Sequence, residues 1–254
     1  MENHGDALVL GVRAGSWSLV AHALEAGADI NARNGVALAA AAAKGSHRMV
    51  EALLKHGADP KRCEEDLLST AVLGGSFAVM RLFAERGCNV RAMDDKALRL
   101  AARDGDSKIV RWLLKRGADP CSRGGESLIS AVQEGHENVV KLLVEAGVDV
   151  NIRDGEPLAS AASRGDMAMM EKLLHLRADV SAGNQKALFR AAMESRIEAM
   201  ELLVSRGADP VKVANMKMGG EGSEKGRCWL FSMAERISLQ AEMGGPAFVG
   251  LKRM

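Results

Sequence analysis

The sequence contains no tyrosine, and aromatic residues make up only 3% of its 254 residues, so large rings cannot form the main part of a core. Hydrophobic residues reach 47%, which leaves alanine, leucine, valine and methionine to fill the interior, as suits closely packed helices. No run of about 20 apolar residues occurs, so we expect no membrane-spanning helix. The four cysteines lack the paired spacing of metal ligands, and we expect reduced thiols and no bound metal.

The chain also lacks a large excess of charge of either sign. Its formal net charge is +1, and residues 1–210 carry 27 Lys and Arg against 29 Asp and Glu. A general nucleic-acid-binding protein needs a strongly basic face, so this balance disfavours nucleic acid as the partner. The first six residues lack the basic and apolar regions of a secretory signal peptide, and we expect an intracellular, cytoplasmic protein.

What the sequence does contain is one pattern of 30 residues, repeated seven times without insertion or deletion. A leucine anchors each copy, at Leu8, Leu38, Leu68, Leu98, Leu128, Leu158 and Leu188. Each copy closes on a variant of Gly-Ala-Asp, whose last residue is Asp29, Asp59, Asn89, Asp119, Asp149, Asp179 or Asp209. A fixed period of this size predicts a solenoid, in which each unit buries its apolar face against its neighbours.

Each copy of the pattern predicts two helices joined by a tight turn. In the second copy we expect the first helix from about Ala37 to Lys44, and Gly45 ends it because glycine adopts a left-handed conformation at little cost. A side chain able to cap the second helix follows, at Ser16, Ser46, Ser76, Asp106 and Asp166. An apolar stripe along the second helix, and a recurrent alanine that keeps the first helix thin, predict an all-α stacked fold.

The pattern Leu-x-x-Ala-Ala-x-x-Gly followed by Val-x-x-Leu-Leu-x-x-Gly-Ala-Asp, clearest over Leu98–Asp119, resembles the ankyrin repeat. The resemblance covers residues 1–210 and implies an ankyrin-type solenoid of seven helix-turn-helix repeats. The period is 30 rather than the 33 typical of the family, and of the Thr-Pro-Leu-His motif only Pro157 keeps the proline. We therefore expect the projecting β-hairpins of the family to be shortened to loops. This compact form resembles arrays of large DNA viruses and microbes, for which the host cytosol or nucleus is the expected location.

Two copies depart from the glycine pattern. Arg177 and Ser195 stand where the other copies have glycine at a helix end. A non-glycine residue in the left-handed region costs roughly 1–2 kcal/mol. Because both positions flank the contact between copies six and seven, we expect this end of the array to fray first.

The sequence shows no catalytic constellation, and we expect no enzymatic activity and no cofactor. The six histidines fall at scattered positions of the repeat. The acidic groups at 64–66 and 94–95 lie in predicted loops, where solvated charge is the simplest interpretation. The glycine-rich segment at 219–226 contains a lysine but lacks P-loop spacing and a preceding strand, so we interpret it as a linker.

The resemblance to ankyrin arrays implies a binding surface, because such arrays grip partners in a concave groove lined by inter-unit loops and first-helix ends. Transferred position by position, the partner-binding set is Arg13, Arg33, Lys44, Met93, Arg103, Asp104, Arg123, Gln133, Glu134, Arg153 and Arg164. Arg33, Arg123 and Arg153 recur at one position and predict a mildly basic stripe. Arginine is suited to bidentate capture of carboxylates, so an acidic protein segment is the favoured ligand.

After Pro210 the period stops. We interpret residues 211–226 as a linker and residues 227–254 as a C-terminal helix, spanning about 227–243, with a mobile tail. Trp229, Leu230, Met233 and Ile237 lie along one stripe of this helix. The stripe caps the last repeat in our favoured interpretation; the alternative is that it docks a second protein, since tryptophan is common at interface hot spots.

These features predict a non-enzymatic, monomeric scaffold or adaptor for protein–protein interaction. The alternative is an inhibitor or immunity-type regulator whose groove blocks the active site of a partner enzyme. Nucleic-acid binding through the arginine stripe is a third interpretation, which steep weakening with salt would distinguish.

Overall fold

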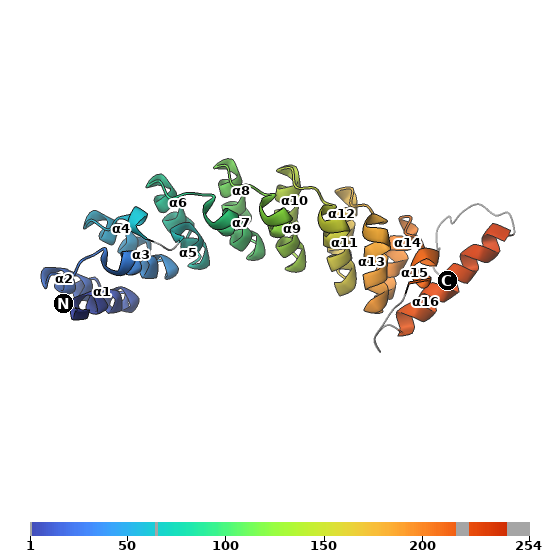
Figure 1. The fold of residues 1–254 in the computed structure, drawn as a ribbon, viewed down its shortest axis with the longest axis horizontal. Helices are drawn as coiled ribbons and strands as arrows, with labels where there is room; N and C mark the ends of the chain where they lie inside the picture. Colours follow the sequence, from blue (N-terminus) through green and yellow to red (C-terminus); the bar gives the residue numbers. More distant parts are fainter. Residues whose placement is uncertain (1, 64–65, 217–223, 243–254) are drawn as a thin grey trace. The chain divides into compact units, whose positions relative to one another are not determined.

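The computed structural model describes residues 2–63, 66–216 and 224–242, and these residues form helices joined by short turns, with no strand among them (Figure 1). The predicted all-α class is therefore confirmed for the described part of the chain. The chain divides into two compact units, residues 1–101 with 106–119, and residues 102–105 with 120–254. Within each unit every copy of the repeat contributes a first and a second helix.

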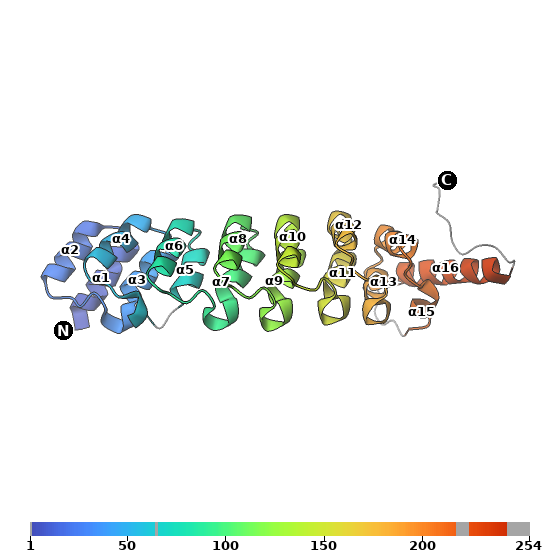
Figure 2. The same ribbon diagram turned by 90° about the horizontal axis from the view of Figure 1, so that it is seen from above.

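The first unit holds four such helix pairs. They are α1 (Glu2–Ala14) with α2 (Trp17–Glu25), α3 (Ala32–Ala43) with α4 (His47–Lys55), α5 (Leu67–Leu73) with α6 (Phe77–Glu85), and α7 (Ala92–Arg103) with α8 (Ser107–Lys115). The last two residues of α7 group with the second unit. A short 3-10 helix, η1 (Pro60–Arg62), precedes α5. Helices α1, α3 and α5 pack in sequence, as do α4 and α6, so the first helices and the second helices form separate layers (Figure 2).

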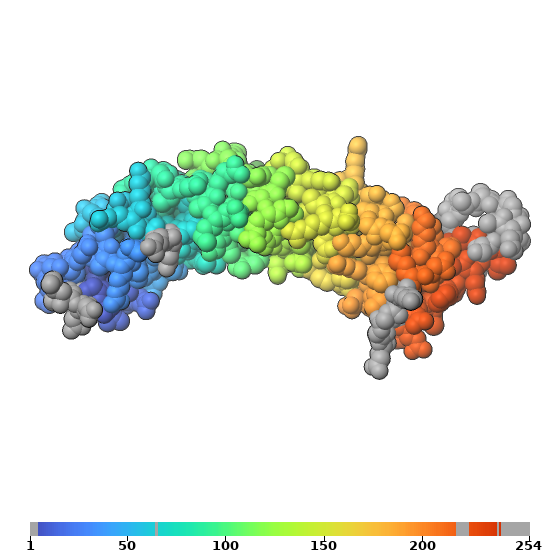
Figure 3. All heavy atoms as spheres, in the orientation of Figure 1, coloured from blue at the N-terminus to red at the C-terminus, as the bar shows by residue number. Residues whose placement is uncertain are grey.

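The second unit holds three helix pairs and two further helices. They are α9 (Ser122–Gln133) with α10 (Glu137–Glu145), α11 (Ile152–Arg164) with α12 (Met167–His175), α13 (Ala182–Met193) with α14 (Ile197–Ser205), then α15 (Pro210–Ala214) and α16 (Glu224–Glu242). Helix α11 packs between α9 and α13, and α12 packs on α14. In the space-filling view the copies of each unit follow one another in chain order without open gaps (Figure 3).

The repeated leucine and alanine positions form the core of both units. All seven anchor leucines are at most 1% exposed, and burial of each leucine contributes about 2–3 kcal/mol. The alanines at 41, 71, 101, 131, 161 and 191 are fully buried. Because alanine adds only a methyl group, each first helix stays thin enough for its neighbours within the unit to pack closely.

The predicted helix ends are confirmed at nearly every position. The recurrent glycines adopt positive φ, and Arg177 (φ 69°) and Ser195 (φ 51°) adopt the same left-handed conformation. Four of the five expected capping side chains accept a backbone N–H bond at the start of a second helix; they are Ser16, Ser76, Asp106 and Asp166. Ser46 is the exception and makes no such side-chain bond.

The segments between copies differ from the plain short loops that we expected. Three successive residues adopt the left-handed helical conformation in five copies, at 33–35, 93–95, 123–125, 153–155 and 183–185, with φ between 50° and 76°. We call each of these segments a left-handed turn. Only afterwards does the right-handed first helix begin. The third copy has η1 instead, followed by residues 64–65, which lie outside the described part.

The C-terminal segment also differs from its interpretation as a linker and a helix. Residues 210–214 form α15 rather than a linker, because the Asp209 carboxylate accepts the N–H groups of Val211 and Lys212 and so caps a new helix. Helix α16 begins at Glu224, three residues earlier than expected. Residues 217–223 of the interpreted linker and the tail from residue 243 onward lie outside the described residues.

Candidate functional site

The left-handed turns hold their backbone through two recurrent hydrogen bonds. Before the turn, a side-chain oxygen of Asp29, Asn89, Asp149 or Asp179 accepts the N–H two residues ahead, at 2.8–3.0 Å. The turn itself is closed by a bond from the N–H of its third residue to the carbonyl four residues earlier, at 3.0–3.4 Å in all five copies. L-residues enter this region rarely, so these bonds stabilise a conformation that the side chains alone disfavour. Each turn therefore presents its first residue on a defined backbone.

A second recurrent hydrogen bond involves the Asp that closes a copy. The backbone N–H of this Asp donates to a side chain at the start of the same copy. Asn31 and Asn151 accept this N–H from Asp59 and Asp179 at 2.8 and 2.7 Å. The copies with Arg91 or Ser181 at the asparagine position lack that acceptor, and there the partner stands four residues later. Asp95 accepts the N–H of Asp119 at 2.9 Å, and Gln185 accepts that of Asp209 at 3.0 Å. Both acceptors are buried at the position that is Gly35 or Gly155 in the asparagine-containing copies.

All eleven residues of the predicted partner-binding set are exposed. The first residues of the turns are exposed, and we call them the tip residues: Arg33, Met93, Arg123 and Arg153. The arginines are not free cations, however. The Arg33 guanidinium lies 2.6 Å from the Asp6 carboxylate, and Arg123 lies 3.0 Å from that of Glu126.

The second unit brings two of the tip arginines together, since Arg153 donates to the carbonyl oxygen of Arg123 at 2.7 Å. The predicted basic stripe is therefore partly neutralised by local partners rather than presented as unpaired charge. Each unit has its own tip residues, with Arg33 and Met93 in the first and Arg123 and Arg153 in the second.

The predicted helix-end residues take part in similar local contacts. In the first unit the Lys44 ammonium donates to the carbonyl oxygen of Arg13. In the second unit Arg103 pairs with Asp104 at 2.9 Å, and Arg164 pairs with Asp166 at 3.1 Å. Gln133 and Glu134 are exposed at the end of α9. These residues combine charge of both signs, which favours recognition of a mixed polar surface over a uniform polyanion.

Sequence reasoning missed a charged cluster that joins α11 and α13. The Glu156 carboxylate receives a bidentate pair of bonds from Arg190, at 2.7 and 3.1 Å, and a bond from Lys186 at 2.7 Å. Burial acts to raise the pKa of Glu156, but the hydrogen bonds and charges of Lys186 and Arg190 outweigh it, so the pKa lies below the ordinary 4.5. The sequence feature that could have predicted this cluster is the opposite charge of Glu156 and Lys186, which lie one 30-residue period apart.

The four cysteines are not joined in disulfides. Burial raises the pKa of the Cys88 thiol to about 11, and the nearby carboxylates of Asp66 and Asp59 add to the effect while Lys61 opposes it. A thiol with this pKa stays protonated at neutral pH and is a poor nucleophile.

Helix α16 packs against α13 and α15. Leu230 and Met233, two residues of the predicted docking stripe, are buried, while Trp229 and Ile237 are half-buried. At Gly226 the helix approaches α13 so closely that a Cβ would lie 2.0 Å from the carbonyl oxygen of Ala192. The Gly226 N–H donates to the Ser195 hydroxyl at 3.3 Å.

No helix among the described residues combines the length and apolarity needed to cross a membrane. A family model described as Ankyrin repeats (3 copies) matches residues 68–154 and 128–214, and a model described as Ankyrin repeat matches residues 36–64. Together these matches span more than half of the chain. No curated protein matches the sequence.

Proposed function

Because the chain belongs to the ankyrin repeat family, whose repeats are generally protein–protein interaction modules, we propose that it is a non-enzymatic scaffold or adaptor. We place the contact with its partner protein on the left-handed turns and on the adjoining ends of the first helices. The predicted partner-binding residues all belong to these two features.

The observation that carries the proposal is the contrast between constant core and varied tips. The anchor leucine is the same in every copy and buried, whereas the first residue of the left-handed turn is Arg33, Met93, Arg123, Arg153 or Gly183. The turn backbone is fixed by hydrogen bonds, so a partner orders little extra chain on binding, which favours affinity. A rigid frame with interchangeable exposed side chains is suited to recognition of another protein surface.

The proposed partner presents an acidic segment, and the arrangement in the second unit supports this choice. Arg153 uses one guanidinium nitrogen for the Arg123 carbonyl, and the planar group is suited to bidentate binding of a carboxylate with its remaining donors. At Arg123 a carboxylate of the partner protein would replace the Glu126 carboxylate in the ion pair with the guanidinium. Because an existing ion pair is lost, each such contact adds little net binding free energy, so we expect several turns to contribute.

Helix α16 has a capping role in this proposal. Its buried Leu230 and Met233 cover α13, the first helix of the last copy, and thereby supply the apolar contact that a terminal repeat otherwise lacks. The proposal therefore places partner recognition on the turns rather than on the stripe of α16.

The test is a quantitative pull-down from native lysate with the full chain, read by mass spectrometry. Two charge-reversed proteins, Arg33→Glu for the first unit and Arg123→Glu/Arg153→Glu for the second, are compared with wild type. We expect the partner to be depleted about tenfold or more by at least one of them, since unmatched charge weakens binding by a few kcal/mol. The matched control is Lys55→Glu/Lys141→Glu, which reverses two exposed lysines on second helices.

A partner retained by both turn variants would place recognition elsewhere and contradict the proposal. Loss of the partner on modest addition of salt, together with recovery of nucleic acid, would assign the surface to phosphate binding instead. An activity assay on the captured protein separates a scaffold from an inhibitor.

A further inference from the structure

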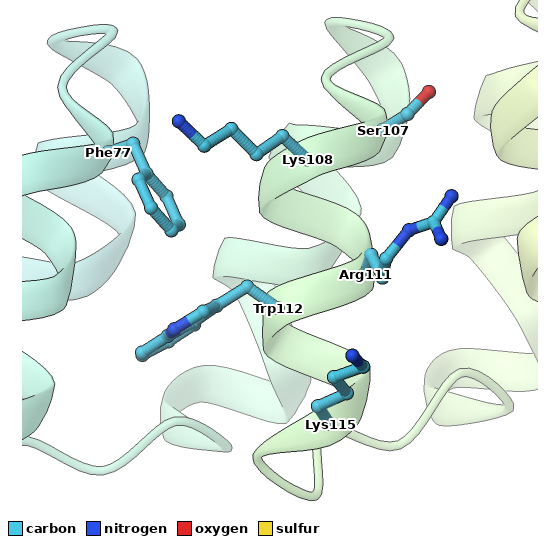
Figure 4. Close-up of a pocket in the computed structure, with 6 residues that line it drawn as sticks. All are labelled: Phe77, Ser107, Lys108, Arg111, Trp112 and Lys115. Carbon is cyan, nitrogen blue, oxygen red and sulfur yellow. The ribbon is translucent and has the colours of Figure 1, made fainter.

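A shallow pocket of about 410 Å³ lies on the second-helix layer of the first unit, between α6 and α8. Figure 4 shows the residues that line it: Phe77 from α6, and Ser107, Lys108, Arg111, Trp112 and Lys115 from α8. Lys108 and Trp112 extend toward α6 and face Phe77, whereas Arg111 points away from α6 and Lys115 lies near the C-terminal end of α8. None of these residues belongs to the turns or to the first-helix ends.

Two aromatic rings give the pocket an apolar wall. The rings of Phe77 and Trp112 meet edge to face, with centroids 6.0 Å apart and planes at 90°. Both side chains are half-buried, so part of each ring remains open to solvent. Cations lie against both rings, with Lys108 Nζ 4.4 Å from the Phe77 centroid and the Arg116 guanidinium 4.8 Å from that of Trp112.

The charge of this pocket has no counterpart on the other second helices of the described chain. Residues 107–116 carry Lys108, Arg111, Lys115 and Arg116 and no acid. Every other second helix contains at least one glutamate; examples are Glu25, Glu51, Glu85, Glu145, Glu171 and Glu201.

Cations at two of the equivalent repeat positions pair with a glutamate of their own helix elsewhere in the chain. Lys55, at the position of Lys115, pairs with Glu51 at 3.2 Å, and Lys141, at the position of Arg111, pairs with Glu145 at 3.7 Å. No described carboxylate forms an ion pair with Lys108, Arg111 or Lys115. A partner that supplies carboxylates therefore meets cations with no internal carboxylate to displace, in contrast to Arg33 and Arg123 of the turns.

We propose that this pocket binds an acidic protein segment that carries one large apolar side chain. The apolar side chain packs against the edges of Phe77 and Trp112, and carboxylates on either side of it pair with the cations of α8. Lys108 and Lys115 are separated by about 10 Å along the helix axis, which three residues of extended peptide span. This is a second contact surface, and it does not depend on whether the turns bind a partner.

Nucleic acid fits the pocket less well, although basic and aromatic residues are both present. Base stacking needs an open ring face, whereas Phe77 and Trp112 stand perpendicular to each other and cations already lie against both rings. A side-chain-sized group that packs against the exposed ring edges is the better match to this geometry.

The experiment uses the full chain and three synthetic ligands. The first is a fluorescent peptide with one phenylalanine flanked on each side by two glutamates, the second has glutamine in place of every glutamate, and the third is a twelve-nucleotide oligothymidine. Binding is followed by fluorescence anisotropy and by the indole N–H resonances of the three tryptophans, Trp17, Trp112 and Trp229. The Trp112 signal is assigned with Trp112→Phe.

We expect the acidic peptide to shift the Trp112 signal selectively and the glutamine peptide to bind at least about tenfold more weakly. Lys108→Glu/Arg111→Glu/Lys115→Glu should weaken the acidic peptide to a similar degree, while the matched Lys55→Glu/Lys141→Glu leaves it unchanged. Helical circular dichroism of both variants checks that the array stays folded.

Three results would overturn the proposal. Absence of any Trp112 shift with the acidic peptide rules out the pocket as its site, and a shift with oligothymidine alone reassigns it to nucleic acid. Peptide binding that is lost in Arg33→Glu or Arg123→Glu/Arg153→Glu but kept in the α8 variant moves the acidic ligand to the turns. That last outcome supports the function proposed for the turns, so the two proposals fail separately.

Discussion

At the scale of single residues, the backbone N–H of the closing Asp in four copies donates to a side chain at or just before the left-handed turn of the same copy. This N–H bonds to an asparagine in some copies and to a buried acceptor four residues later in others, as with Asn31 and Asp95. A buried N–H without a partner costs about 1–3 kcal/mol. The two arrangements supply the same kind of acceptor from different positions, whereas copy five, which has Cys121 and Gly125 there, carries neither residue type.

Asp95→Gly should lower the free energy of unfolding by about 1–3 kcal/mol, because the N–H of Asp119 loses its acceptor. Release of left-handed strain at position 95 offsets part of this loss, so the lower half of the range is expected. The double variant Arg91→Asn/Asp95→Gly reproduces the Asn31 and Gly35 arrangement and should recover most of the stability. Urea unfolding followed by circular dichroism measures both variants. A double variant no more stable than Asp95→Gly would show that the two arrangements are not interchangeable.

Residue identity alone predicted some of these conformations and not others. Arg177 and Ser195 were recognisable because they replace glycine at a helix end, and both are left-handed. The left-handed turns were not predicted, although Asn34-Gly35 and Gly124-Gly125 contain residues that favour this region. The first turn residues, such as Arg33 and Met93, have no such preference and adopt the conformation because neighbouring hydrogen bonds enforce it.

At the scale of elements, α11 and α13 are joined by the carboxylate of Glu156 with Lys186 and Arg190. The folded-state pKa of Glu156 lies below its ordinary value of 4.5, so the folded protein holds this proton less tightly than the unfolded chain does. The resulting stabilisation is complete above the ordinary value and is lost as the pH falls through the lowered one.

Glu156→Gln should lower the free energy of unfolding by about 1–2 kcal/mol at pH 7, since charge-assisted bonds to a half-buried carboxylate are lost. The difference from wild type should shrink as the pH falls below 4.5, because the wild-type carboxylate then becomes neutral as well. Urea midpoints at several pH values between 7 and 3 measure this. Glu171→Gln, an exposed glutamate on α12, is the control and should change stability by less than about 0.5 kcal/mol throughout. A Glu156→Gln deficit that persists at the lowest pH would contradict the ionic origin.

The contact of α16 with α13 depends on the absence of a side chain at Gly226. Gly226→Ala places a Cβ against the backbone carbonyl of Ala192, which cannot rotate away, so we expect α16 to be displaced and stability to fall by about 1–3 kcal/mol. A red shift of the Trp229 emission, assigned with Trp229→Phe, reports the displacement. Gly5→Ala is the matched control, because its Cβ would lie at an ordinary 3.7 Å from that of Ala32. Unchanged emission and stability in Gly226→Ala would argue against a capping helix.

The helix pairs were predictable from sequence because their determinants recur at fixed positions: the anchor leucine, the terminal glycine and the capping Ser or Asp. The cluster at Glu156 joins residues that are 30 and 34 positions apart and become neighbours only when copies stack. The pocket at Phe77 and Trp112 was also missed, since the two rings occupy different repeat positions and so show no periodic signal. A contact that occurs only once in the array leaves no periodic pattern in the sequence and is found only in the structure.

At the scale of the whole molecule, the stability of a repeat array is approximately a sum of copy and neighbour terms. Left-handed Arg177 and Ser195 each cost roughly 1–2 kcal/mol, whereas a partly exposed ion pair such as that of Glu156 returns about 1 kcal/mol. At the helix ends, strain therefore outweighs the ionic contact between copies six and seven, whereas copy four confines its left-handed non-glycine residues to its turn and has Gly105 and Gly117 at its helix ends.

Hydrogen exchange should accordingly be faster in copies six and seven, residues 151–210, than in copy four, residues 91–120. Arg177→Gly should slow exchange in copy six by about fivefold, the effect of roughly 1 kcal/mol of relieved strain after the larger entropy of glycine in the unfolded chain is subtracted. Ser195→Gly should slow exchange less, because the substitution also removes the Ser195 hydroxyl that accepts the Gly226 N–H. Equal protection of copies four, six and seven would refute the expected fraying.

The acceptor for the closing Asp stands at one of two positions, that of Asn31 or that of Asp95. This alternation matters for the design of an idealised copy from this chain. A consensus sequence chosen column by column treats the two positions as independent, and it can combine Arg91 of one copy with Gly35 of another. Such a copy holds neither side-chain acceptor for its closing Asp, as in copy five with Cys121 and Gly125, although each of its residues is native somewhere in the chain. The smallest unit that can be exchanged between copies is therefore the pair of positions, and a recombination point placed between them would give a weak joint.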